Sequence, residues 1–199
     1  MLTFDLRSQA TIDAAERTFS RRGYGNANMR EIAAEADLSI AGLYYYLPSK
    51  AAALRIVCKR ALLAMMHGFD LALNSASAPE ARLRLFIQHH VTFVVRNAHA
   101  YRVLLRDIDS LEGEDHTFIF GLRRSYFEQV TDLVIAVQQE RRSGTSTHVA
   151  TAALFGMMNW IPMWLRESDE KRASQIANEL SNVFLFGLCE SAELTQVAS

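Results

Sequence analysis

The sequence predicts an all-α protein of about nine or ten helices, because its apolar residues follow a helical period and helix-breaking residues are scarce. Apolar side chains recur every three or four residues along most of the chain. No stretch combines strict alternation of apolar and polar residues with β-branched enrichment, as a half-buried strand does. Proline occurs only at positions 48, 79 and 162 of the 199 residues, so long helices can run without interruption.

The composition indicates a globular protein with a real hydrophobic core. Half of the residues are apolar, and no apolar run approaches the roughly 20 residues of a membrane helix. The N-terminus lacks a signal-peptide core, so we expect a cytoplasmic protein with no membrane partner. Cys58 and Cys189 match no metal or redox spacing and are expected to be small buried hydrophobes. Residues 1–60 contain nine Lys and Arg and six Asp and Glu, whereas residues 61–199 contain twelve and sixteen. This distribution fits a basic N-terminal head (residues 1–60) on an acidic remainder of the chain.

The first predicted helix runs from about Leu6 to Arg22. Ile12, Ala15 and Phe19 are spaced to share one face of this helix. Gly23 follows two arginines and is a typical helix end, with cations near the negative end of the helix dipole.

Two short helices follow. Asn28 precedes Glu31 by three residues, the spacing of a capping box, and starts a helix that ends near 37–38. Ser39 caps a third helix from Ile40 to about Leu47, which Pro48 ends. Two short helices after a longer one, within 50 residues, predict a helix-turn-helix.

The third helix is expected to present tyrosines to the outside. Leu43 and Leu47 lie one turn apart and face the core, so Tyr45 points away from them while Tyr44 and Tyr46 flank the seam. The first turn consists of the small or smooth residues 40–42, and such a helix tip fits a DNA major groove about 12 Å wide. Tyr hydroxyls and Lys50 would then reach phosphates on either side.

The rest of the chain is predicted to consist of further helices. Their expected ranges are about 49–74, 81–96, 98–108, 116–142, 148–166 with an interruption near Pro162, and 168–190. Ser146 or Thr147 is expected to cap the helix that begins at 148.

The first 50 residues resemble the DNA-binding domain of the tetracycline-repressor (TetR) family of transcriptional regulators. The residues that carry the resemblance are Ile12, Ala15, Phe19, Gly23, Tyr24, Met29, Ile32, Ala33, Ala36, Leu38, Ser39, Leu43, Tyr44, Tyr45, Tyr46, Ser49 and Lys50. The chain departs from the family pattern at Asp37, where Gly is usual, at Leu47, where Phe is usual, and at Ile40 and Gly42, where polar residues are common.

The resemblance implies a domain division and a set of DNA contacts. Residues 1–50 would bind a double-stranded DNA operator, and residues 51–199 would bind an effector and form a homodimer through the last two helices, with the helix from about 49 to 74 shared. The expected DNA-binding residues are Asn28, Ser39, Ile40, Ala41, Gly42, Tyr44, Tyr45, Tyr46 and Lys50. Repression of a palindromic operator, relieved by the effector, is the mode that the family implies.

Met and aromatic residues on the later helices are candidates for an effector pocket, with plain core packing as the alternative. The segment "GMMNWIPMWLRES" resembles the TetR subgroup that senses acyl-CoA thioesters, and a smaller hydrophobic effector is the rival. The expected effector-binding residues are Met65, Met66, Phe69, Phe93, Tyr126, Met157, Asn159, Trp160, Met163 and Arg166.

Other classes of function fit the sequence less well. His89 and His90 are adjacent and point about 100° apart on a helix, so they cannot ligate one metal together. No nucleophile elbow, P-loop or dinucleotide fingerprint occurs. We therefore expect no enzyme, cofactor or metal, and the remaining alternatives are a helical protein-interaction module and an activator without ligand-relieved repression.

Overall fold

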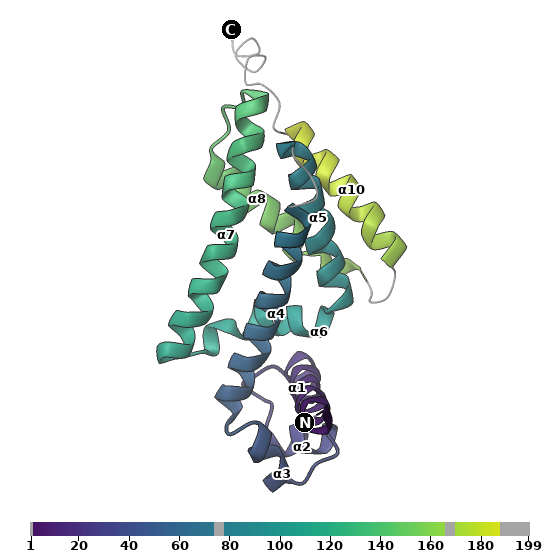
Figure 1. Cartoon of the computed structure of the whole chain (residues 1–199), viewed down its shortest axis with the longest axis vertical. Helices are drawn as coiled ribbons and strands as arrows, with labels where there is room; N and C mark the ends of the chain where they lie inside the picture. Colours follow the sequence, from purple (N-terminus) through teal and green to yellow (C-terminus); the bar gives the residue numbers. More distant parts are fainter. Residues whose placement is uncertain (1, 74–77, 166–169, 188–199) are drawn as a thin grey trace. The chain divides into compact units, whose positions relative to one another are not determined.

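The computed structural model describes residues 2–73, 78–165 and 170–187, and these residues form helices and no strand (Figure 1). The all-α prediction is confirmed. The elements are α1 (Leu2–Arg22), α2 (Met29–Glu35), α3 (Ile40–Tyr46), α4 (Lys50–Leu73), α5 (Pro79–Arg96), α6 (Ala98–Asp107), the 3-10 helix η1 (Ile108–Ser110), α7 (Gly113–Arg141), α8 (Thr147–Asn159), α9 (Ile161–Trp164) and α10 (Glu170–Gly187).

Proline positions explain two of the boundaries. The expected interruption near Pro162 is present, because α8 ends at Asn159 and Pro162 stands in the first turn of α9. Pro79 is the first residue of α5, two residues before the predicted start. Proline is tolerated there because the first backbone N–H groups of a helix have no partner within the helix.

The contacts within the chain divide it into two compact units. The first unit comprises residues 1–64 and 97–122, and the second comprises residues 65–96 and 123–199. The helices α4 and α7 each contribute residues to both units, and the division in α4 falls between Ala64 and Met65. The first unit therefore includes α6 and η1, which lie well beyond the 50 residues expected for the head.

The core of the first unit is built by the apolar faces of its helices. In this unit α1 packs against α2, α3 and α6. Phe19, Ile32, Leu43 and Leu47 are buried with almost no exposed surface. Cys58 is also buried, as expected, whereas Cys189 lies outside the described residues.

In the second unit α10 packs along α5, as Figure 1 shows. Arg141 of α7 binds to both helices. It donates to the carboxylate of Glu80 in α5 and to the carbonyl of Leu185 in α10, each at 2.6 Å. None of the described helices is long and apolar enough to cross a membrane. The described residues also hold no cluster of His, Cys, Asp or Glu suited to a metal ion.

Candidate nucleic-acid interface and effector region

The starts of α2 and α3 are fixed by side-chain caps. The Asn28 side chain accepts a hydrogen bond from the Glu31 N–H at 3.0 Å, and the Glu31 carboxylate accepts one from the Asn28 N–H at 3.3 Å. Ser39 Oγ accepts from the Gly42 N–H at 3.1 Å. Asp37 takes the left-handed conformation of the intervening turn, with φ 52°. Asp tolerates this conformation better than most residues, so the turn forms without the usual glycine.

The helix α3 presents one face to the core and the opposite face to the outside. Leu43 is fully buried, whereas Tyr45 is 74% exposed, Tyr44 48% and Ile40 41%. The rings of Tyr45 and Tyr46 meet edge to face at 5.2 Å. The expected outward orientation of Tyr45 is thus present.

Lys50 has a structural role that the sequence did not predict. Its ammonium donates to the carbonyls of Tyr24, Gly25 and Ala27 at 2.9, 3.4 and 3.0 Å. It also lies 4.5 Å above the Tyr24 ring. An ammonium has three donors, and all three are used in holding the turn between α1 and α2. Sequence reasoning missed this because the acceptors are backbone atoms 23 to 26 residues away.

Most arginines at the surface of the head are paired with acids. Arg17 and Arg21 both bind the Glu35 carboxylate, which lowers its pKa to about 2, and Arg22 pairs with Glu31. Arg30 is exposed on α2 and makes no ion pair with any described residue. Sequence reasoning did not select Arg30, although its position one residue beyond Met29 places it in the first turn of α2.

Two of the expected effector residues belong to an aromatic cluster in the second unit. Phe69 and Tyr126 lie 5.9 Å apart between ring centroids, and Phe86 and Phe155 lie within 6 Å of Tyr126. Met65 and Phe93 are also buried, and Met66, Met157 and Asn159 are half-buried. These positions are interior or close to it, as the sequence predicted.

A buried histidine joins the same cluster. His90 Nδ1 lies 3.0 Å from the Tyr126 hydroxyl, and both residues are buried. Burial, together with the neighbouring His89, lowers the pKa of His90 to about 3, so the ring is neutral near pH 7. Sequence reasoning considered His90 only as a metal ligand and therefore missed this polar pair inside an apolar core.

Trp160 and Met163 lie at the surface and not in the interior, where the sequence had placed them. They are 63% and 69% exposed, because the chain turns at Trp160 before Pro162 and the two side chains leave the buried face of α8. Arg166 lies outside the described residues.

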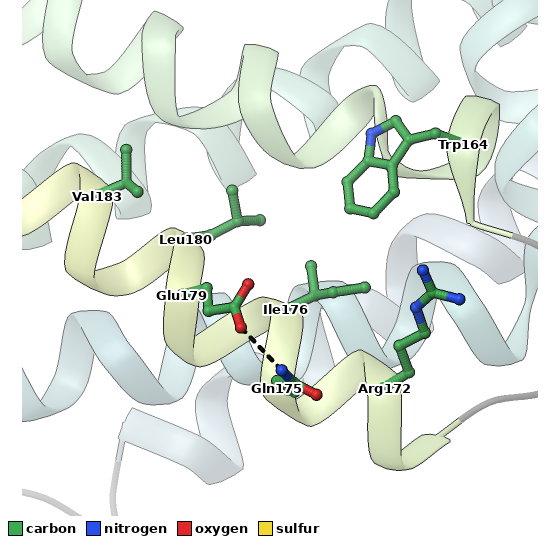
Figure 2. A pocket seen from close by; sticks show the side chains of 7 residues that line it. All are labelled: Trp164, Arg172, Gln175, Ile176, Glu179, Leu180 and Val183. Carbon is green, nitrogen blue, oxygen red and sulfur yellow. Dashed lines mark hydrogen bonds between the residues drawn. The ribbon is translucent and has the colours of Figure 1, made fainter.

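A surface cleft of about 360 Å³ lies between α9 and α10 in the second unit. Figure 2 shows the Trp164 indole facing Ile176 and Leu180 of α10, with Arg172 at one end. Gln175 donates to Glu179 at 2.9 Å along the polar edge. The cleft is open and mainly apolar. Trp164 belongs to the segment that the sequence had indicated for an effector, whereas the α10 side of the cleft was not predicted.

Two family models match the chain. The model described as "Tetracyclin repressor-like, C-terminal domain" matches residues 76–188, and the model described as "Bacterial regulatory proteins, tetR family" matches residues 12–55.

The chain is also similar to individual proteins. It is 26% identical over 154 residues to the HTH-type transcriptional activator FasR of Mycolicibacterium smegmatis, covering 77% of this chain and 68% of that protein. The crystal structure of the TetR-family regulator PfmR from Thermus thermophilus has a TM-score of 0.79 at 24% identity, covering 88% of this chain and 93% of that one. AibR in complex with isovaleryl coenzyme A and operator DNA also has a TM-score of 0.79 at 24% identity, covering 89% of this chain and 97% of that one. At these identities the two structures show that the fold is shared.

Proposed function

Since the chain belongs to the TetR family of bacterial transcriptional regulators, we propose that it binds a palindromic operator as a homodimer and that a hydrophobic or acyl-CoA effector controls this binding. Regulators of this family act by binding DNA and are not enzymes. Such a protein would act in the cytoplasm, where its operator is.

The outward face of α3 is the observation that carries the proposal. Tyr45 and Tyr44 are large side chains with a hydroxyl, and they are exposed on a helix whose opposite side is buried through Leu43. Ile40, Ala41 and Gly42 leave the tip of this helix narrow, which suits close approach to base edges, including thymine methyl groups. The exposed Asn28 and Arg30 at the start of α2 would contact phosphates.

The dimer is proposed from the apolar surface of the last helices. Val183 and Phe186 of α10 are 63% and 70% exposed. Trp160, which precedes α9, and Trp164, its last residue, are also exposed. Exposed apolar groups gathered on neighbouring helices mark a surface that another protein covers. A second copy explains this surface and also supplies the second recognition helix, about 34–36 Å away, that a palindrome requires.

The effector site is proposed in the interior of the second unit, around Met65, Phe69, Phe93 and Tyr126. The His90–Tyr126 pair would bind a polar group of the effector, such as a carbonyl, within the aromatic cluster. AibR, whose fold this chain shares, was solved with an acyl-CoA, and this favours an acyl-CoA over an unrelated small molecule. Arginines would then be needed for the phosphates of the coenzyme.

We propose ligand-relieved repression as the direction of control, in keeping with the usual mode of the family. The similarity to FasR favours activation as the alternative. A reporter gene placed behind the operator separates the two, because deletion of the regulator raises expression in the first case and lowers it in the second.

Operator binding is tested with duplexes selected by the purified protein from random DNA. We expect a palindrome with half-sites one helical turn apart, and an affinity that falls steeply with salt because phosphate contacts release counterions. Tyr45→Ala should weaken binding at least about tenfold with an unchanged melting temperature. Phe118→Ala removes another exposed aromatic of the same unit and should have no effect. Unfolding of Tyr45→Ala, or affinity equal to wild type, would contradict the proposed interface.

The effector is sought by native mass spectrometry of the purified protein and by titration with isovaleryl-CoA. Release of the selected duplex by isovaleryl-CoA would support the acyl-CoA class. Release only by the free acid, or by an unrelated co-purified compound, would contradict it.

A further inference from the structure

The C-terminal end of α1 is held by side chains of α6. The last carbonyls of a helix have no partner within the helix and need donors from elsewhere. In this protein the Arg106 guanidinium donates to the carbonyls of Phe19 and Ser20, and the Phe19 carbonyl also accepts from the Gly23 N–H at 2.8 Å. His99 Nδ1 and Arg102 Nη1 lie 3.0 and 2.9 Å from Ser20 Oγ.

The position of the Arg106 guanidinium is itself fixed by a neighbour. Its Nε and Nη2 donate to the two carboxylate oxygens of Asp107 at 3.0 and 2.9 Å. Asp107 is only 6% exposed, so the two side chains of this bidentate ion pair have little conformational freedom. A planar guanidinium with both edges engaged holds its acceptors in a defined geometry, which an ammonium does not do.

The same guanidinium lies against the turn that leads to the DNA-reading helices. Gly23 has φ +79°, and a Cβ at this position would lie 3.8 Å from three atoms of the Arg106 guanidinium. The following residues, 24–27, are the ones whose carbonyls receive Lys50. The turn between α1 and α2 is therefore fixed by two cations, Lys50 from α4 and Arg106 from α6.

The division of the chain by contacts supports the same grouping. Residues 97–122 form one compact unit with residues 1–64, so α6 belongs structurally to the unit that carries α2 and α3. The link from α6 to the head rests on hydrogen bonds to backbone carbonyls, which orient the backbone, and not on apolar contact alone.

We propose that Arg106 is a positioning residue for operator binding. Its hydrogen bonds to the end of α1 fix the conformation of the turn at residues 23–27, and this conformation determines how α2 and α3 are presented to DNA. Arg106 acts through the backbone of Phe19 and Ser20 and does not itself contact DNA. The inference rests on the proposed operator binding.

The test compares two double variants that each remove one Arg–Asp pair from the first unit without changing its net charge. Arg106→Gln with Asp107→Asn removes the guanidinium that binds the carbonyls of α1 and leaves no unpaired buried carboxylate. Arg55→Gln with Asp115→Asn is the control, because that pair is 3.0 Å apart, carries the same two charges and has no hydrogen bond to the turn. The control pair is the more exposed of the two, since the Asp115 side chain is 39% exposed and that of Asp107 is 8% exposed. Affinity for the selected duplex and for random duplex, melting temperature, and amide hydrogen exchange at residues 23–27 are measured for both.

We expect the Arg106/Asp107 variant to lose about tenfold or more in affinity for the selected duplex, within the usual range of coupling between sites. Its affinity for random duplex and its melting temperature should match the control, while the amides of residues 23–27 exchange faster. Arg106→Lys should recover only part of the loss. Equal operator affinity in the two double variants, or a loss that appears only with a fall in melting temperature, would overturn the inference. A wild-type protein that selects no duplex would instead overturn the proposed function on which it rests.

Discussion

Replacing Gly68 by alanine should destabilise the protein, although alanine is the better helix former. Gly68 lies inside α4, and helix propensity alone favours alanine there by about 0.8–1.0 kcal/mol. In this structure the ring of His89 occupies the space of the new side chain. A Cβ at Gly68 would overlap His89 Cε1 and lie 2.5 and 2.9 Å from the two ring nitrogens.

The cost of moving the ring can be worked out from its contacts. His89 Nε2 donates to the Met65 carbonyl at 3.1 Å, and the ring is half-buried, so it cannot swing aside without loss. Losing that hydrogen bond costs about 1 kcal/mol, and forcing an extra methyl into a packed contact costs about 1–3 kcal/mol. After the propensity gain is subtracted, Gly68→Ala should lower the free energy of unfolding by about 1–3 kcal/mol.

A double-mutant cycle tests this reasoning. In a His89→Ala background the obstacle is gone, and Gly68→Ala should then stabilise by up to about 1 kcal/mol. The assay is urea unfolding of the four proteins at one fixed protein concentration, since association would shift the apparent stability. If Gly68→Ala changes the free energy of unfolding equally in both backgrounds, the close approach of His89 to α4 is not the reason for the glycine.

Further predictions concern the proposed dimer and the titrating groups. Val183→Glu should convert the dimer to monomer in sedimentation with helix content retained, and an unchanged mass would place the interface elsewhere. His90 has a lowered pKa of about 3 in the folded state, so the unfolded state binds more protons below pH 6.5 and stability should fall as pH drops from 6.5 to 5. His90→Phe should flatten this slope, which reaches at most about 1.4 kcal/mol per pH unit, and an identical slope would show that other groups cause it. The two arginines lower the pKa of Glu35 to about 2, so its contribution to the free energy of unfolding is present above pH 4.5 and is lost as the pH falls through about 2. Glu35→Gln should therefore reduce the loss of stability between pH 4.5 and 2.

Local patterns in the sequence predicted local structure well. The capping box of Asn28 and Glu31 is present in both of its hydrogen bonds, because its partners are three residues apart and lie in one helical turn. The outward direction of Tyr45 follows from the buried positions of Leu43 and Leu47 on the same short helix. Such features depend only on helical geometry, which the spacing of residue types determines.

Features that depend on distant parts of the chain were not predictable in this way. Lys50 was expected at a phosphate, but its acceptors are carbonyls of a turn that only the tertiary fold brings near. Trp160 was expected inside, since aromatic residues in a helical stripe usually pack in a core, but the break before Pro162 turns it outward. The position of Arg106 at the end of α1 depends on contacts across more than 80 residues.

The length of α4 limits which insertions and deletions this chain can accept during evolution. Each residue of a helix adds about 100° of rotation and 1.5 Å of rise. Inserting or deleting one residue near Ala64 would therefore turn Phe69 and everything after it in the helix away from its present neighbours. Substitutions can accumulate on the exposed side of α4, whereas gains and losses of residues are expected to survive only in the connecting loops.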